Sequence, residues 1–98
     1  MSARNPTTET SRKLRDLVGV GKSIEQNLHD LGIRSVSDLA ASDGDELYRK
    51  LCEQIRTRQD PCVLDTFRCA VAQARNPELP LEQRSWWWWS RERKAARL

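Results

Sequence analysis

Apolar residues recur every three or four positions along most of the chain, which is the spacing of α-helices that bury one face. Leu14, Leu17 and Val18 predict a short first helix, for which Thr10 or Ser11 is the N-cap. Two glycines then interrupt the pattern. A second helix follows on the apolar positions Ile24, Leu28 and Leu31, with Gly32 as its C-cap.

Three further helices are predicted downstream. A short one runs through Leu39 and Ala40 behind Ser35 or Ser37, and the next follows the turn at residues 42–45 on the stripe Leu47, Tyr48, Leu51 and Ile55. Asp60-Pro61 is a start signal for the last helix, because aspartate caps a helix and proline fits its first position. We expect this helix at the centre of the core because of its long apolar face, formed by Val63, Leu64, Phe67, Ala70, Val71 and Ala74.

The pattern therefore predicts a single all-α domain of about five short helices. A chain of 98 residues can bury one modest core, and no segment shows the alternation of a strand. We expect a flexible N-terminus at residues 1–11, the domain at residues 12–89 and a basic tail at residues 90–98. Asn76-Pro77 ends the last predicted helix and Pro80 prevents it from resuming.

Composition points to a soluble protein of a reducing compartment. No apolar run approaches the roughly 20 residues of a membrane-spanning helix, and the polar first eleven residues do not form a secretory signal. Three cysteines, Cys52, Cys62 and Cys69, fit neither a disulfide framework nor a zinc module, so we interpret them as small buried hydrophobic residues. We expect a cytoplasmic protein without a metal or other cofactor, and His29 as a surface residue.

The net charge of +3 is unevenly distributed along the chain. The segment from Arg84 to Leu98 has five basic residues and one acidic residue, whereas the first 83 residues have twelve basic and thirteen acidic ones. Any attraction for an anionic partner must therefore come from local geometry or from the C-terminal segment. We expect Arg68 to form a structural salt bridge with Asp60, Asp65 or a helix C-terminus.

The candidate binding segment is Gly19, Val20, Gly21, Lys22 and Ser23, which lies between the first two predicted helices. It resembles the helix-hairpin-helix motif of SAM-like DNA-binding domains. The resemblance implies that the glycines let the turn approach a DNA phosphate, that Val20 anchors the turn in the core, and that backbone N–H groups meet the phosphate. Independently of the family, a helix N-terminus offers unpaired N–H donors and a partial positive charge, which favour an anion.

Another interpretation of this segment stays open. The glycines also suit a tight packing turn in a helical bundle, and Glu25 stands where the motif commonly has alanine. Basic residues that would support a phosphate contact are Arg12, Lys13, Arg15 and Arg34. Because one hairpin contacts few phosphates, a second contact would be needed, and residues 57–60 form a candidate second hairpin without glycine.

Four consecutive tryptophans, Trp86, Trp87, Trp88 and Trp89, lie between Arg84 and Arg91. Aromatic faces beside arginine suit stacking on unpaired bases. Alternatively, alternate indoles dock on the helical core as a C-terminal anchor, and we favour this anchor because four exposed tryptophans would promote aggregation.

From about Leu14 to Trp89 the chain resembles short bacterial proteins known as pathogenicity-locus or mitomycin-resistance proteins. The resemblance is carried by Leu17 to Gly21, Leu31-Gly32-Ile33, Leu47-Tyr48, Leu51-Cys52, Asp60 with Cys62-Val-Leu64, Phe67-Arg-Cys-Ala70 and the tryptophan run. It implies a bacterial helix-hairpin-helix domain associated with DNA, without an established activity.

The sequence thus favours weak, sequence-independent DNA binding in repair, recombination or damage resistance, on duplex or branched DNA. The alternative is a protein-interaction adaptor with a tryptophan-rich docking end, and a small accessory enzyme or drug-binding protein is a third. No acid–base pair or nucleophile constellation stands out, so we predict no catalytic residue. We expect no membrane partner, and the sequence leaves the oligomeric state open.

Overall fold

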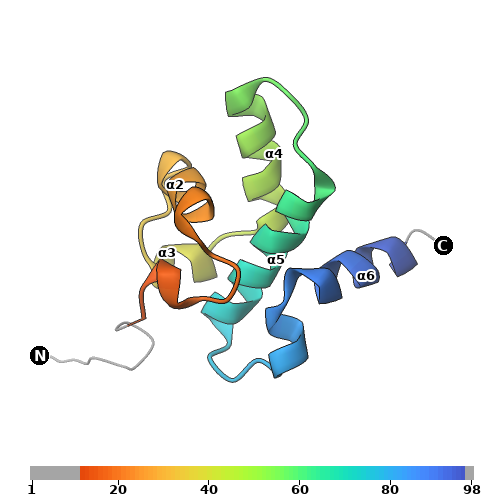
Figure 1. Cartoon of the computed structure of the whole chain (residues 1–98). Helices are drawn as coiled ribbons and strands as arrows, with labels where there is room; N and C mark the ends of the chain where they lie inside the picture. Colours follow the sequence, from red (N-terminus) through yellow and green to blue (C-terminus); the bar gives the residue numbers. More distant parts are fainter. Residues whose placement is uncertain (1–11, 97–98) are drawn as a thin grey trace, which may run out of the picture.

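The fold is organised around one long helix, α5, in a computed structural model that describes residues 12–96 (Figure 1). In chain order its elements are the 3₁₀ turn η1 (Leu14–Asp16), α2 (Lys22–Asp30), α3 (Val36–Ala40), α4 (Gly44–Ile55), α5 (Pro61–Arg75), the 3₁₀ turn η2 (Leu81–Arg84) and α6 (Trp86–Ala96). The prediction of an all-α fold is confirmed. Within residues 12–96 no helix is both long and apolar enough to cross a membrane.

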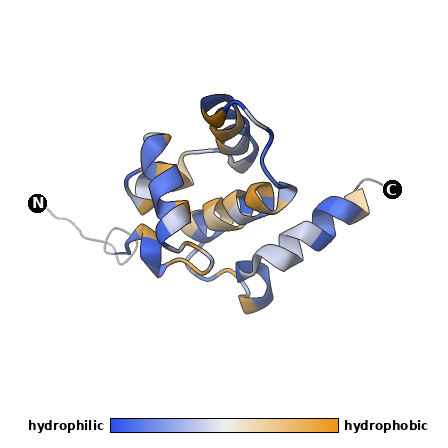
Figure 2. Cartoon of the chain, turned by 45° about the horizontal axis from the view of Figure 1, so that its top comes forward, coloured by the Kyte–Doolittle hydropathy of each residue, from blue (hydrophilic) through white to orange (hydrophobic). Residues whose placement is uncertain are grey.

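The start and the apolar face of α5 follow the sequence signals. The Asp60 carboxylate accepts the Cys62 N–H at 2.8 Å, and Pro61 occupies the first helical position. Phe67 and Ala70 are almost fully buried, and α5 contacts α3, α4, α6 and η2. Apolar colour therefore runs along α5 and the side of α4 that faces it (Figure 2), and the expectation that α5 lies at the centre of the core is confirmed.

A second face of α5 is polar and equally buried. Asp65, Cys69 and Gln73 follow one another at intervals of four residues, so they lie on one side of the helix, and each is at most 4% exposed. We call these three residues the polar stripe. It holds the segments on either side of α5, because Asp65 binds α6, Cys69 contacts the η2 backbone and Gln73 binds the loop after η1.

The predicted first α-helix is wrong, because the described part of this segment forms only the 3₁₀ turn η1. Leu14 and Leu17 are both buried, and residues three apart stand directly above one another in a 3₁₀ turn. The Asp16 carboxylate accepts the Lys13 N–H at 2.8 Å and closes the turn. Val18 is 52% exposed instead of packed. The predicted caps Thr10 and Ser11, and the expected flexible segment 1–11, lie outside the described residues.

The C-terminal segment contains a helix that the sequence analysis missed. Pro80 is followed by η2, and α6 then runs through the tryptophans and past the expected domain boundary at residue 89. Ser90 is buried and Arg93 binds Asp65, so this part of the expected basic tail belongs to the packed domain. The sequence analysis missed this helix because Pro77 and Pro80 end α5 and indicate a loop. Proline prevents α5 from continuing, but it does not prevent a new helix from starting further on.

Two expectations of burial are wrong, and the salt bridge expected of Arg68 forms with a different partner. Ile55 is 49% exposed because it is the last residue of α4, beyond the end of the core stripe. Cys62 is exposed in the first turn of α5. Arg68 pairs with Asp45, with Nε–Oδ1 at 2.6 Å, because α4 begins directly against α5. A Cβ on Gly44 would lie 2.9 Å from the Arg68 Cα, so only glycine permits this approach.

Two helices end in the same backbone arrangement with different residues. After α2, Gly32 has φ +89° and the Ile33 N–H donates to the Leu28 carbonyl at 2.8 Å, which is a Schellman motif. After α4, Arg56 has φ +62° and the Thr57 N–H donates to the Cys52 carbonyl at 3.2 Å. Arg56 therefore occupies a left-handed position that favours glycine.

We predict that Arg56→Gly stabilises the fold by about 1 kcal/mol, since it removes the steric cost of a Cβ in the left-handed region. Urea denaturation followed by circular dichroism measures the change. Arg56→Ala is the control, because it removes the same side chain and keeps the Cβ. Equal effects of the two substitutions would contradict the backbone explanation.

Candidate functional site

Residues 17–23, which we call the glycine hairpin, join η1 to α2 in a tight exposed turn. Gly19 has φ +87°, a conformation that side chains rarely adopt. Val20 is 4% exposed and anchors the turn in the core, as the sequence predicted. Gly21 has extended backbone angles and is the N-cap of α2, and a Cβ there would meet nothing within 4 Å. The two glycines thus have different roles: Gly19 shapes the turn, whereas Gly21 keeps the helix start uncovered.

The glycine hairpin is held against α5 by a residue of the polar stripe, Gln73. The Gln73 side chain donates from Nε2 to the Val18 carbonyl and accepts the Val18 N–H at Oε1, both at 2.9 Å. One buried amide thus satisfies both backbone polar groups of Val18. Arg12 adds a second tie, since its guanidinium donates to the carbonyls of Gln73 and Ala74 at 3.0 and 3.1 Å. The backbone of the turn is therefore fixed relative to α5.

The N-terminus of α2 differs from those of the next three helices. Side chains cap α3, α4 and α5, where Ser35, Asp43 and Asp60 accept backbone N–H groups. Gly21 offers α2 no side-chain acceptor. The first N–H groups of α2 therefore face solvent beside the exposed Lys22 and Ser23, and an anion there would gain donors and the helix dipole.

Charges around the glycine hairpin are partly used within the protein. Arg15 lies 3.5 Å from the Glu25 carboxylate, so this pair reduces the effect of the acidic residue that departs from the motif. Arg12 is occupied by the α5 carbonyls. Lys13, Lys22 and Arg34 are exposed. Of the predicted supporting residues, Lys13 and Arg34 thus leave their side chains in solvent.

Sequence reasoning missed Gln73 and the structural role of Arg12. Gln73 interrupts the most apolar helix, and a polar residue inside such a face is the signal that could have found it. Nothing in the sequence pairs it with Val18, because 55 residues separate the two. Arg12 gives no comparable signal, since an arginine before a helix is usually solvated.

The candidate second hairpin, residues 57–60, connects α4 to α5. Arg56, Thr57 and Arg58 are exposed there. Asp60, however, caps α5, and its hydrogen bond to the Cys62 N–H holds the pKa of the carboxyl below its ordinary value. A charged carboxylate thus occupies the position that an anion would take, so this connection lacks the open helix start of the glycine hairpin.

The tryptophan run divides into two pairs. Trp88 and Trp89 are half-buried, pack edge to face with ring centroids 5.1 Å apart, and Trp89 Nε1 donates to the Gln83 carbonyl at 2.8 Å. Trp86 and Trp87 are 44% and 47% exposed. The expected docking of alternate indoles does not occur, because the four tryptophans lie on a helix, where the side-chain direction turns by about 100° per residue.

α6 is fastened to α5 by a buried ion pair. Arg93 donates to both carboxylate oxygens of Asp65, at 2.9 and 3.1 Å, and the Asp65 side chain is fully buried. Cys69 supplies a second contact, since burial raises the pKa of its thiol to about 11 and the neutral thiol lies 3.6 Å from the Gln83 carbonyl oxygen. These contacts fix the helix that displays the exposed indoles.

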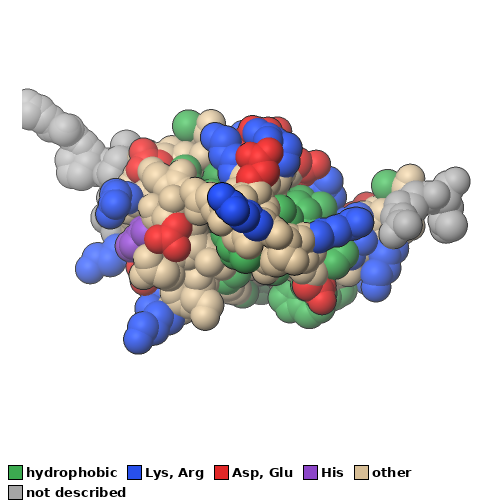
Figure 3. Space-filling model, turned by 90° about the horizontal axis from the view of Figure 1, so that it is seen from above, with side chains coloured by type: hydrophobic (Ala, Val, Ile, Leu, Met, Phe, Trp, Pro, Cys, Tyr) green, Lys and Arg blue, Asp and Glu red, His purple; other side chains and the backbone are tan. Residues whose placement is uncertain are grey.

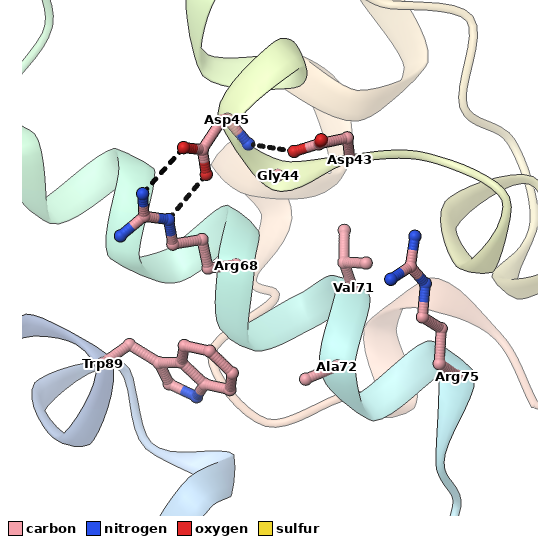
Figure 4. A pocket seen from close by; sticks show the side chains of 8 residues that line it. All are labelled: Asp43, Gly44, Asp45, Arg68, Val71, Ala72, Arg75 and Trp89. Atoms are coloured by element: carbon pink, nitrogen blue, oxygen red, sulfur yellow. Dashed lines mark hydrogen bonds and ion pairs between the residues drawn. The ribbon is translucent and has the colours of Figure 1, made fainter. Parts of the chain in front are cut away.

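A cavity of about 280 Å³ lies between the start of α4, α5 and Trp89 (Figure 4). The side chains that line it hold the fold together and are not arranged to bind a ligand. Its two cations are engaged, because Arg68 binds Asp45 and Arg75 donates to the carbonyls of Ala40 and Ser42 at 2.9 and 2.7 Å. No free cation therefore points into it for a ligand. Within residues 12–96 no three His, Cys, Asp or Glu side chains gather as metal ligands would.

The fold and these surfaces define a small all-helical protein with a glycine hairpin and a tryptophan-bearing C-terminal helix. The chain belongs to the Cdd1 family, described as "Pathogenicity locus", whose sequence model matches residues 7–95. It is 36% identical over 88 residues to the mitomycin resistance protein McrB of Streptomyces lavendulae. These residues cover 90% of this chain and 80% of that protein. No solved structure matches the chain. The resemblance to this family is confirmed, and the helix-hairpin-helix interpretation stays a prediction.

We predict that Gln73→Leu destabilises the protein by about 1 to 3 kcal/mol, because it leaves the backbone groups of Val18 without their buried partner. Hydrogen exchange at the Val18 amide should accelerate, and urea denaturation gives the free energy. Gln26→Leu is the control at an exposed site, where glutamine pairs only with Asp30 on the surface. Unchanged exchange at Val18 would show that Gln73 does not hold the turn.

We also predict that Arg93→Met destabilises the protein by about 3 to 5 kcal/mol, because Asp65 stays buried without its counter-charge. Replacing both residues, Asp65→Leu with Arg93→Met, should recover most of the loss. Thermal unfolding of the two variants and of the exposed control Lys94→Met provides the comparison. If the double variant were no more stable than Arg93→Met, the unpaired charge would not be the cause.

Proposed function

We propose that the protein binds the DNA backbone weakly and without sequence preference through the glycine hairpin. The observation that carries this proposal is the open N-terminus of α2. Its N-cap residue, Gly21, has no side chain to accept the first N–H groups, and it lies on a turn that Gln73 holds in place. A phosphate oxygen would accept N–H groups of Gly21 to Ser23, with Lys22 beside it. Such contacts position a protein on DNA without reading bases.

The rigidity of the turn supports this proposal. A loop that must be ordered on binding loses affinity through lost conformational freedom. Val20 in the core and Gln73 beneath Val18 have already ordered this loop. The family relative from Streptomyces lavendulae is named for mitomycin resistance, and a role in damage resistance on DNA agrees with that name.

The expected affinity is low. One or two neutralised phosphates give a slope of log affinity against log salt of about −1 to −2. The overall charge adds little, because acidic and basic residues nearly balance over the first 83 positions. No catalytic step is part of the proposal, and the protein acts by binding.

We predict that Gly21→Asp lowers the affinity for duplex DNA by about tenfold or more, since the carboxylate takes the phosphate position and repels the backbone. The fold should be as stable as wild type or more stable by a few tenths of a kcal/mol, because aspartate caps a helix at least as well as glycine. Space permits the substitution, as a Cβ at Gly21 meets nothing within 4 Å.

Fluorescence anisotropy with a labelled 20-base-pair duplex across a salt series measures this loss. Gln54→Glu on the exposed surface of α4 is the matched control, since it makes the same charge change and Gln54 lies beside Asp30, at the opposite end of α2 from Gly21. Equal binding by wild type and Gly21→Asp would show that the glycine hairpin is only a packing turn. A protein adaptor would likewise keep its partner when Gly21 is replaced.

A further inference from the structure

A groove of about 580 Å³ lies between the start of α5 and α6. Trp86 and Trp87 line it from α6 together with Arg91 and Lys94, and Pro61 lines it from α5. Hydrophobic side chains with Lys and Arg beside them are visible toward the C-terminal end of the molecule in Figure 3. The hairpin function described above does not use this groove.

The indoles in the groove are displayed on a fixed support. Arg93, on the same helix, is held by the buried Asp65, and Trp89 is hydrogen-bonded to the η2 backbone. Trp86 and Trp87 are nevertheless 44% and 47% exposed. Exposed large apolar side chains lower the stability and solubility of a protein. Where a rigid element holds them at the surface, they commonly mark a binding site.

The charges of the groove select an anionic partner. Arg91 lies over the Trp87 ring with its guanidinium carbon 5.0 Å from the ring centroid, and it has no carboxylate partner among residues 12–96. Lys94 is exposed on the following turn of α6. The Asp60 carboxylate also lines the groove and accepts the Cys62 N–H, so within residues 12–96 the lining sets two cations without a carboxylate partner, Arg91 and Lys94, against one carboxylate. Aromatic faces beside free cations match an unpaired base and its phosphate.

The shape favours a nucleotide over a membrane surface. The two indoles line a recess between two helices, whereas lipid headgroups meet a helix that lies flat with one continuous apolar face. Past Trp89, the polar residues of α6 continue around the helix, and Glu92 adds a negative charge among its cations. The volume falls in the range of roughly 300 to 1,000 Å³ that small-molecule sites occupy, which suffices for one nucleotide.

We propose that this groove binds an unpaired nucleotide, with the base stacked on Trp86 or Trp87 and the phosphate beside Arg91 and Lys94. This inference rests on the proposed function, and it makes DNA with a single-stranded segment next to a duplex the preferred substrate class. The hairpin contacts the duplex backbone, and the groove supplies the second contact that a single hairpin lacks.

The test compares two labelled 15-residue strands of equal charge, oligo(dT) and an abasic strand with the same phosphates. Wild type should bind oligo(dT) more tightly, and only oligo(dT) should quench tryptophan fluorescence. The double substitution Trp86→Ala, Trp87→Ala should weaken oligo(dT) binding by about 5- to 150-fold, the range expected for loss of one stacked base. Trp86→Phe with Trp87→Phe should keep most of the affinity, because phenylalanine also stacks.

Leu81→Ala is the matched control, since Leu81 is 77% exposed and lies outside the groove. Circular dichroism establishes that each variant is folded. Equal binding of the two strands by wild type, or unchanged oligo(dT) binding after loss of both indoles, would overturn the proposal. So would binding of phosphatidylglycerol vesicles that requires both indoles while oligo(dT) binding does not.

The two sites fail separately in this design. Gly21→Asp should reduce binding of a 20-base-pair duplex and leave binding of oligo(dT) largely unchanged, whereas loss of Trp86 and Trp87 should do the reverse. A duplex with a single-stranded dT overhang should bind more tightly than either part alone, and both substitutions should weaken it. Duplex binding insensitive to Gly21 would reject the hairpin and leave the groove standing on its oligo(dT) result.

Discussion

The polar stripe of α5 is the constraint on which the rest of the structure depends. Asp65, Cys69 and Gln73 are buried on one side of the helix, and each needs a partner because an unpaired buried polar group costs free energy. Each finds it in a different segment: Arg93 of α6, the η2 backbone at Gln83, and Val18 of the glycine hairpin. Both candidate binding surfaces are therefore positioned by polar contacts with one helix, while its apolar face holds α3 and α4.

The helix starts and ends that were predicted correctly are those that depend on residues close together in the sequence. Asp60-Pro61 begins α5, Ser35 caps α3 and Gly32 ends α2, because caps and left-handed turns depend on a few neighbouring residues. The turn at Gly19 was predictable for the same reason, because its positive φ is a backbone conformation that favours glycine. The position of Val20 in the core was implied by the helix-hairpin-helix resemblance instead, and Val20 is buried.

Pairings between distant residues were out of reach of the sequence. Asp65 and Arg93 are 28 positions apart, and nothing local distinguishes Arg93 from the other cations near the C-terminus. For Arg68, two carboxylates and a helix C-terminus were the candidate partners, and the choice of Asp45 depends on the close crossing that Gly44 permits. The tryptophan run was misjudged in its local structure, because four identical residues have no periodicity from which a helix can be recognised.

For the DNA binding that we propose, the distribution of charge favours two weak sites over one strong site. Its helical core is close to neutral, so the protein gains little long-range attraction for an anionic polymer. Affinity must then come from short-range contacts that geometry creates, which are the open start of α2 and the indoles of α6. Two such contacts on one rigid body would act on one DNA molecule at a high effective concentration, so modest individual affinities would multiply. They would also select for shape, because only a ligand that presents both a duplex backbone and an unpaired base can occupy both proposed sites. Selectivity for DNA structure would thus arise without any residue that reads a base sequence.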